Sequence, residues 1–194
     1  MYHYTSDICW DAMHYKGQQG LLRLRSFISS SDYAPCKEAQ QGTIFGLLEE
    51  KPATWIKYKN HNGNSVFETL LRTCAVRGDD MAGFCDWPDE EKKLVLLKVE
   101  LLPQDNPFVV DFIHISRMYE NLKKTNAISQ EQIQSQASLQ YWQSRIPLQR
   151  YSGNYTLPEV IVHNHLPLER IEKVWEKTLP QYLTEVYGKT QLLK

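Results

Sequence analysis

The chain has 194 residues, a length that suits one domain with a core of its own and is short for two. Hydrophobic residues make up 42% of it and charged residues 23%, which is typical of a globular protein and not of a disordered or fibrous one. The 22 Lys and Arg against 23 Asp and Glu give a formal net charge of −1, which argues against a protein whose main role is to coat nucleic acid or an anionic membrane.

Neither a membrane anchor nor a secretory leader is expected from the sequence. No apolar run approaches the roughly 18 residues that a membrane span needs, and the opening MYHYTSDICW lacks the basic start and apolar stretch of a signal peptide. The four cysteines are scattered and form no CxxC pair, which argues against a zinc cage and indicates free thiols. We therefore expect a protein that is cytoplasmic as made.

Hydrophobic spacing and turn residues predict the elements of the first half. Ser6 or Asp7 can cap the first helix, which is expected to end near Gly17. In chain order we expect a strand over 2–5, a helix over 8–15, a turn and short strand over 20–25, an apolar run over 43–48 and a helix over 65–77.

The second half is predicted to alternate strands with helices. Residues 128–142 are Gln-rich and fit either a helix or an exposed loop. The remaining expected elements are strands over 94–101, 108–115 and 157–163, and helices over 117–124 and 166–177. Pro158 opens the last strand, and Pro167 falls in the first turn of the last helix. Strands in both halves around intervening helices predict a single α+β domain over residues 1–194.

Two titratable residues stand out by their settings. His3 lies on the first predicted strand, before a helix. Glu159 lies between Pro158 and a strongly apolar run, at the mouth of a predicted central strand, where a carboxylate needs an explanation because charged side chains are rarely buried. Taken singly, His3 could be a surface histidine and Glu159 a solvated acid at a strand edge. The two residues become candidates for a functional site because both are present in these settings.

The two ends of the chain together resemble the ADP-ribosyltransferase family. The opening Tyr-His-Tyr-Thr-Ser at residues 2–6, followed by a helix and the Gly20-Leu21 turn, resembles the first nicotinamide-binding strand of that fold. The closing Pro-Glu-Val-Ile-Val-His-x-x-Leu-Pro-Leu-Glu-x-Ile at residues 158–171 is similar to the catalytic-glutamate strand of bacterial ADP-ribosylating toxins, including those that modify DNA bases. The resemblance implies a split, mostly antiparallel sheet with flanking helices, which binds NAD between its halves.

By this resemblance the chain is a mono-ADP-ribosyltransferase that uses NAD as a co-substrate and needs no metal. Glu159 would be the catalytic residue: cleavage of the nicotinamide–ribose bond builds positive charge on the ribose, and a carboxylate near the 2′-hydroxyl stabilises that charge. His3 would hydrogen-bond the adenosine-side ribose. The other residues implied in cofactor binding are Tyr4, Thr5, Ser6, Gly20, Arg23 and Phe45.

Several of these assignments have structural alternatives. Tyr4 alternates with His3 along the strand and is therefore expected to face the opposite side, into packing. Thr5 is equally well a plain strand or capping residue. Arg23 could pair with the NAD pyrophosphate or lie on a solvated face, and Phe45 could stack on nicotinamide or belong to the core.

The acceptor is expected to be a protein side chain other than arginine. Arginine-specific relatives carry an acid two residues before the catalytic glutamate, and this chain has Leu157 there. Tyr151 and Tyr155 lie in a Gly-containing loop where relatives keep a target-recognition loop, so they could contact the acceptor. Residues 125–150 could form an inserted helix or loop with the same purpose.

Other readings stay open at this point. By analogy with toxins and effectors, the acceptor could be a host protein such as ubiquitin or a small GTPase. By the same analogy, the protein could be delivered into a target cell without a classical signal peptide. An antitoxin or immunity protein could then exist as a partner. A transferase that modifies DNA or RNA is the alternative acceptor class, and a catalytically idle protein-binding module is the alternative from another class. A metal site on His163, His165 and His114 has less support, because no acid or cysteine lies at close ligand spacing.

Overall fold

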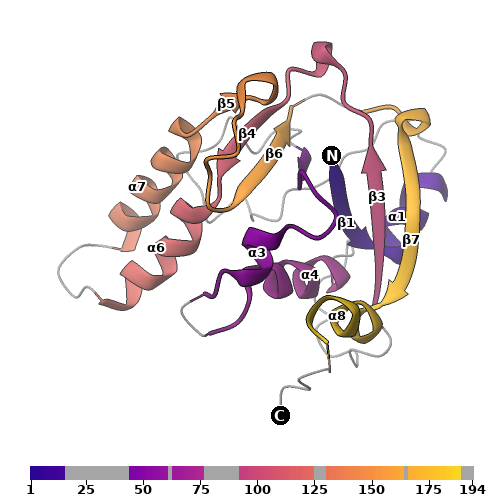
Figure 1. Ribbon diagram of the computed structural model, residues 1–194, viewed down its shortest axis with the longest axis horizontal. Coiled ribbons are helices and arrows are strands. Elements are labelled where there is room, and N and C mark those ends of the chain that lie inside the picture. Colours follow the sequence, from indigo (N-terminus) through magenta and orange to yellow (C-terminus); the bar gives the residue numbers. More distant parts are fainter. Residues whose placement is uncertain (16–43, 61–62, 77–91, 125–129, 164–165, 189–194) are drawn as a thin grey trace.

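The computed structural model describes residues 1–15, 44–60, 63–76, 92–124, 130–163 and 166–188. These residues form an α+β fold with two antiparallel sheets and flanking helices (Figure 1), as the sequence predicted. Within these stretches, no helix is both long and apolar enough to cross a bilayer.

The first sheet contains the N-terminal strand. Its strands, in the spatial order β1-β3-β7, are β1 (Tyr2–Ser6), β3 (Lys93–Val99) and β7 (Ile171–Thr178). The central strand β3 pairs antiparallel with both neighbours, and its register sets His3 opposite Leu97 and Thr5 opposite Val95. Because paired residues point to the same side of a sheet, His3 and Thr5 share a face with Leu97 and Val95.

The second sheet contains the strand that carries Glu159. Its strands, in the order β2-β6-β4-β5, are β2 (Ile44–Gly46), β6 (Pro158–Val162), β4 (Phe108–Asp111) and β5 (Ile146–Pro147). β6 lies between β2 and β4, so the predicted central strand is confirmed. Phe45 and Phe108 both pair with Ile161, and Val110 pairs with Glu159.

Helices flank both sheets (Figure 1). Their bounds are α1 (Asp7–Tyr15), α3 (Ala53–Lys57), α4 (Val66–Val76), α6 (Ile113–Lys124), α7 (Gln130–Gln143) and α8 (Leu179–Tyr187). The Ser6 hydroxyl accepts a hydrogen bond from the Cys9 amide at 3.2 Å, so Ser6 caps α1. In Figure 1, α6 and α7 lie beside the second sheet, and α4 and α8 lie at one end of the first.

Three clusters of buried side chains hold these layers together. The first core cluster joins one face of the first sheet to α4 and α8 and includes Tyr4, Phe67, Leu71, Leu96, Leu157 and Tyr182. The second joins one face of the second sheet to α6 and α7 and consists of Phe45, Val110, Ile115, Met118, Ile133, Ala137, Tyr141 and Ile161. The third joins the two sheets and consists of Ile44, Val95, Leu97, Val99, Val162 and Leu166.

The two sheets also meet through the backbone, at a bridge between Tyr2 and Leu47. Their amides and carbonyls exchange two hydrogen bonds, of 2.8 and 2.7 Å. Gly46 lies directly beside this bridge, and a Cβ atom there would lie 2.4 Å from Cγ of Met1 and 2.7 Å from the Tyr2 carbonyl oxygen. A side chain at position 46 would therefore push the sheets apart.

The predicted helix over 166–177 is wrong. Residues Leu168–Arg170 form a short 3-10 turn, and the strand β7 follows it to Thr178. The register passes from Leu96 opposite Trp175 to Leu97 opposite Lys173, which leaves Val174 as a β-bulge. The bulge puts one extra residue between Ile171 and Trp175, so the apolar residues acquire the i, i+3, i+4 spacing of a helix while the chain is a strand.

Other boundaries differ from the sequence prediction for local reasons. The strand predicted over 108–115 stops at Asp111, because the Asp111 carboxylate accepts the Ile113 amide at 3.1 Å and so caps α6. The helices α3 and α8 were not expected. In the segment 125–150, residues Gln130–Gln143 are helical, which settles the choice between helix and loop there, whereas residues 125–129 lie outside the described part.

Candidate active site

Glu159 is a buried acid on β6, an inner strand of the second sheet. Residues 159 and 161 of β6 share one face, and Ile161 on that face packs in the second core cluster under α6 and α7. The Glu159 side chain is 4% exposed. The preceding Pro158 and the β-branched run of β6 favour a strand here, and Glu159 itself pairs with Val110 of β4.

The surroundings of Glu159 favour its protonated form. Burial raises the pKa of Glu159 to about 8, and a hydrogen bond from Tyr141 opposes that rise. The Tyr141 hydroxyl on α7 donates to Oε2 of Glu159 at 2.6 Å, and this is the one hydrogen bond to the carboxyl group among the described residues. No cation in those residues contributes to the pKa of Glu159. At neutral pH the group is therefore mostly a neutral acid.

Asp111 fixes the start of β6. Its Oδ1 accepts the Leu157 amide at 2.9 Å, and its Oδ2 accepts the Thr156 amide at 3.1 Å. The side chain itself is 8% exposed and also caps α6. Since Leu157 precedes Glu159 by two residues, Asp111 sets where the strand with the candidate catalytic acid begins.

Ser144 connects this arrangement to α7. Its hydroxyl accepts the Asp111 amide at 2.9 Å and donates to the Tyr141 carbonyl oxygen at 2.7 Å. Its own carbonyl oxygen accepts the Tyr155 hydroxyl. The C-terminal end of α7 is thus anchored to β4 and to the loop before β6.

His3 lies on the neighbouring sheet. Its side chain is 4% exposed, and its Nδ1 lies 2.7 Å from the carbonyl oxygen of Phe45 in β2. A carbonyl oxygen can only accept, so Nδ1 carries the proton and donates it. The structure does not bring His3 and Glu159 into direct contact. They are linked through β2, because Phe45 pairs with Ile161, two residues along β6 from Glu159.

The other residues implied in cofactor binding are placed as follows. Tyr4 is 2% exposed in the first core cluster, on the side of β1 opposite His3, and its hydroxyl lies 2.6 Å from that of Tyr182, so the packing expected from alternation is confirmed. Phe45 is 3% exposed in the second core cluster, the position of a core residue. Thr5 is buried on the His3 face, whereas Gly20 and Arg23 lie outside the described residues.

Tyr151 and Tyr155 form a pair in the loop before β6. Their ring centroids lie 5.2 Å apart, and the Tyr155 amide donates to the Tyr151 hydroxyl at 3.3 Å. Burial raises the pKa of both phenols, and the nearby Asp111 carboxylate adds to the rise. Both side chains are half-buried and brace the loop. Their assigned contact with an acceptor stays a prediction.

His163 directly follows β6 and lies in an aromatic cluster. Its ring lies 5.3 Å from that of Phe108 and 5.6 Å from that of Trp142, and the Arg145 guanidinium lies 4.0 Å from the centre of the Trp142 ring. Burial lowers the pKa of His163, and Arg145 lowers it further. Among the described residues no group of three or more His, Cys, Asp or Glu side chains could hold a metal ion, and His165 lies outside them.

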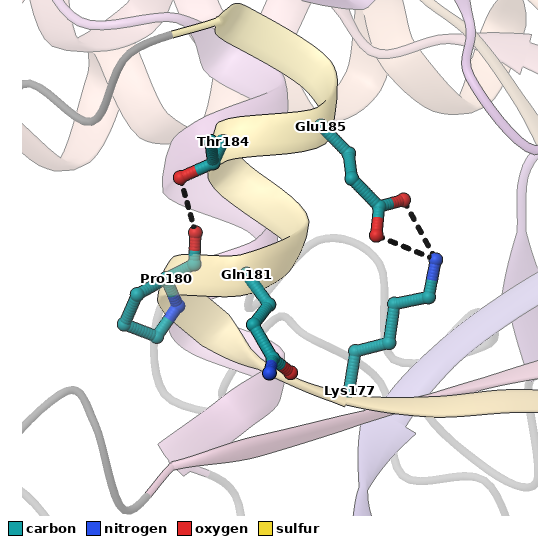
Figure 2. A pocket seen from close by; sticks show the side chains of 5 residues that line it. All are labelled: Lys177, Pro180, Gln181, Thr184 and Glu185. Carbon is teal, nitrogen blue, oxygen red and sulfur yellow. Dashed lines mark hydrogen bonds and ion pairs between the residues drawn. The ribbon is translucent and has the colours of Figure 1, made fainter.

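A surface hollow of about 580 Å³ lies away from these residues (Figure 2). Lys177 at the end of β7 and the α8 residues Pro180, Gln181, Thr184 and Glu185 line it. The Lys177 ammonium contacts both carboxylate oxygens of Glu185, at 2.6 and 2.8 Å, and the Thr184 hydroxyl donates to the Pro180 carbonyl oxygen. Because these polar groups satisfy one another and the hollow opens widely to solvent, it is not a candidate site.

Sequence reasoning missed the two residues that hold Glu159 and its strand. Tyr141 falls in the Gln-rich segment that fitted a helix or a loop, and its contact with Glu159 is tertiary. Asp111 is a residue type that favours helix starts, but it fell inside the strand predicted over 108–115, six residues before the predicted helix. No protein-family model matches the sequence, and neither a curated protein nor a solved structure matches the chain.

Proposed function

We propose that this chain is a mono-ADP-ribosyltransferase that cleaves NAD, with Glu159 as its catalytic residue. The setting of Glu159 carries the proposal: a carboxyl group in the middle of a sheet, 4% exposed, with a pKa raised to about 8 and no cation beside it in the described residues. Burying an acid without a cationic partner lowers stability. Such arrangements concentrate at functional sites, where the perturbed group has a chemical task.

The proposed reaction uses the carboxylate to stabilise charge. The bond between C1′ of the ribose and the nicotinamide nitrogen breaks, and its electron pair leaves with nicotinamide. Glu159, once ionised, accepts a hydrogen bond from the ribose 2′-hydroxyl and stabilises the positive charge that develops on the sugar. The acceptor nucleophile then bonds to C1′, and its proton passes to the Glu159 carboxylate.

The raised pKa of Glu159 fits this task. The nicotinamide ring of NAD is cationic, and a nearby positive charge favours the ionised form of a carboxyl group. Substrate would therefore lower the pKa of Glu159 from about 8 and produce the carboxylate where it is needed. In the free protein, the fraction of ionised Glu159 rises with pH, so turnover should increase from pH 6 towards pH 8 and above.

The N-terminal strand supports the proposal through His3. Its imidazole is buried and tied by Nδ1 to β2, which pairs with the strand that carries Glu159. A histidine held in this way keeps its Nε2 in a fixed direction, as a group that recognises a ribose hydroxyl requires. Gly20 and Arg23 would complete the NAD site by resemblance.

The acceptor proposed here is a protein side chain other than arginine. The position two residues before Glu159, which carries an acid in arginine-specific relatives, holds Leu157. Leu157 is fully buried in the first core cluster, and its amide is bound by Asp111. This position can therefore offer no group to a guanidinium.

The test is release of nicotinamide from NAD by the purified chain, compared with the Glu159→Gln variant. We expect the substitution to lower kcat by about 100-fold or more, because it removes a charge that acts on the transition state. Glu172→Gln is the matched control: Glu172 is an exposed acid on β7 in the first sheet, whereas Glu159 lies in the second, and the variant should keep wild-type turnover. Equal nicotinamide release by Glu159→Gln and the wild type would overturn the role of Glu159.

The acceptor class is tested with NAD labelled in its adenosine part. Lysates from bacterial and eukaryotic cells are incubated with the wild-type chain and with Glu159→Gln, with and without nuclease. A labelled protein band that is absent with Glu159→Gln supports a protein acceptor. Label that nuclease removes assigns the acceptor to DNA or RNA. If the wild type neither labels a lysate nor releases nicotinamide, the transferase proposal fails and the binding-module reading replaces it.

A further inference from the structure

We propose that Tyr141 is a positioning residue for the reaction, one that holds Oε2 of Glu159 so that the other carboxyl oxygen is presented to the ribose. This inference rests on the proposed function of Glu159 and adds a residue that the N- and C-terminal motifs do not contain. The residue that orients the Glu159 carboxyl group is thereby assigned to α7, a segment for which the sequence fitted either a helix or a loop.

The contact itself is short and enclosed. The Tyr141 hydroxyl lies 2.6 Å from Oε2 of Glu159, within the range of an O–H donor to a carboxylate oxygen. Tyr141 is 1% exposed and Glu159 is 4% exposed, so water competes little for this bond. Because this is the one hydrogen bond to the carboxyl group in the described part of the chain, the proposal assigns Oε1 to the ribose hydroxyl.

The packing of α7 explains why the phenol reaches this point. Ile133, Ala137 and Tyr141 recur at intervals of four residues and share the buried face of the helix. The Tyr141 ring packs edge-on against Phe112, with centroids 6.4 Å apart. On this buried face, the Tyr141 hydroxyl reaches Glu159 on β6.

A closed circuit of hydrogen bonds fixes both partners. The Asp111 carboxylate binds the amide of Leu157, two residues before Glu159, at 2.9 Å. The Asp111 amide donates to the Ser144 hydroxyl, which donates to the Tyr141 carbonyl oxygen. The Tyr141 hydroxyl donates to Glu159, and the backbone of residues 157–159 joins Glu159 to Leu157. The hydrogen bonds and this stretch of backbone together form a closed ring. One residue, Asp111, therefore sets the position of the donor and of the acceptor together, which is what a precisely held pair requires.

Among the described residues, the groups known to lie on this side of the second sheet are mainly apolar. Val110 on β4 lies opposite it, and Phe45 on β2 and Ile115 and Met118 on α6 belong to the same core cluster. Tyr141 is the titratable residue that acts on Glu159 among the described residues. Removal of its hydroxyl thus tests one interaction with little interference from others.

The experiment is the Tyr141→Phe variant, which keeps the ring and removes the hydroxyl. Glutamate labelled with ¹³C at the side-chain carboxyl group reports the titration of Glu159, and the Glu159→Gln variant identifies its resonance. We expect the midpoint to rise by about one to two pH units in Tyr141→Phe, the shift that corresponds to one hydrogen bond to a charged group. The acidic limb of the kcat/KM profile for nicotinamide release should move by the same amount, with a lower kcat at pH 7.

Tyr182→Phe is the matched control. Tyr182 is also a fully buried phenol with a hydroxyl partner, but it lies in the first core cluster beside Tyr4. Its loss should lower stability and leave the pH profile and the Glu159 midpoint at their wild-type values. Unchanged values in Tyr141→Phe as well would overturn the proposal.

A second variant keeps the proposal testable if Tyr141→Phe folds poorly. Ser144→Ala opens the hydrogen-bond circuit but keeps the phenol, and it should lower kcat without raising the KM for NAD. An increase in KM alone would contradict a positioning role. The carboxyl titration needs no turnover, so it shows whether the Tyr141 hydroxyl acts on Glu159 even if the wild type releases no nicotinamide. A failure of the proposed function is thereby distinguished from a failure of the Tyr141–Glu159 contact.

Discussion

The imidazole of His3 on β1 lies 2.7 Å from the carbonyl oxygen of Phe45 on β2, so the His3 side chain forms a hydrogen bond between the first sheet and the second. Phe45 in turn pairs with Ile161 on the strand of Glu159. His3 therefore has a structural role in addition to the proposed contact with NAD. The two roles use different nitrogen atoms of one ring and can be separated.

We expect His3→Ala and His3→Asn to differ in stability but not in NAD binding. Alanine leaves the buried Phe45 carbonyl oxygen without its donor, which should lower the free energy of unfolding by about 1–3 kcal/mol. The asparagine amide can donate from nearly the position of Nδ1 and should recover most of that loss. Both variants lack Nε2, so both should raise the KM for NAD by about tenfold or more.

Chemical denaturation and nicotinamide release measure the two effects. If His3→Asn restores the KM for NAD as well as the stability, His3 is a structural link only and contacts no substrate.

The buried acid predicts an unusual dependence of stability on pH. The pKa of Glu159 is raised to about 8 in the folded chain, against 4.5 for an unperturbed glutamate. Between these values the folded state keeps a proton that the unfolded state has lost, so stability falls as pH rises through this window and levels off above it. The loss amounts to about 1.4 kcal/mol per unit of pKa difference, or several kcal/mol in all.

Glu159→Gln should remove this dependence. The glutamine carbonyl oxygen can still accept the Tyr141 hydroxyl, but the side chain no longer has to ionise inside the sheet. We expect the variant to be close to the wild type near pH 4.5 and more stable than it by several kcal/mol near pH 8.5, as measured by urea denaturation at each pH. Glu172→Gln, on the exposed edge strand β7, should follow the wild-type curve. A wild type and a Glu159→Gln variant that fall in parallel would show that Glu159 is ionised throughout.

Local sequence signals predicted the parts of the fold that local contacts determine. The cap at Ser6, the helix over Val66–Val76 and the central strand with Glu159 follow from capping residues, helical spacing and a β-branched run. The capping box of Thr178 and Gln181, with Pro180 between them, was also present in the sequence and would have located α8. The helix predicted over 166–177 ends directly before this capping box and therefore obscures it.

Tertiary contacts determine what the sequence could not predict. The bulge at Val174 has no marker of its own, since it arises from pairing with Leu96 and Leu97. Tyr141 likewise gains its position from the packing of α7 on the second sheet, over a separation of 18 residues from Glu159. A candidate catalytic acid could thus be picked out along the chain, but the group that orients it could be found only in three dimensions.

The close approach of the two sheets at Gly46 gives a final prediction, on the link between fold and site. In Gly46→Ala the new methyl group would meet the Tyr2 carbonyl oxygen at 2.7 Å, and that oxygen is fixed because it accepts the Leu47 amide. The side chain of Met1 can move away, whereas the backbone of β1 cannot do so without lengthening the bridge. We expect a loss of about 1–3 kcal/mol in the free energy of unfolding and faster hydrogen exchange at the Leu47 amide.

Gly153→Ala is the control, because a Cβ there has nothing within 4 Å and only its φ of 83° opposes the change. It should cost about 1 kcal/mol and leave exchange at Leu47 unaltered; unchanged exchange in Gly46→Ala would mean that the bridge accommodates the methyl group.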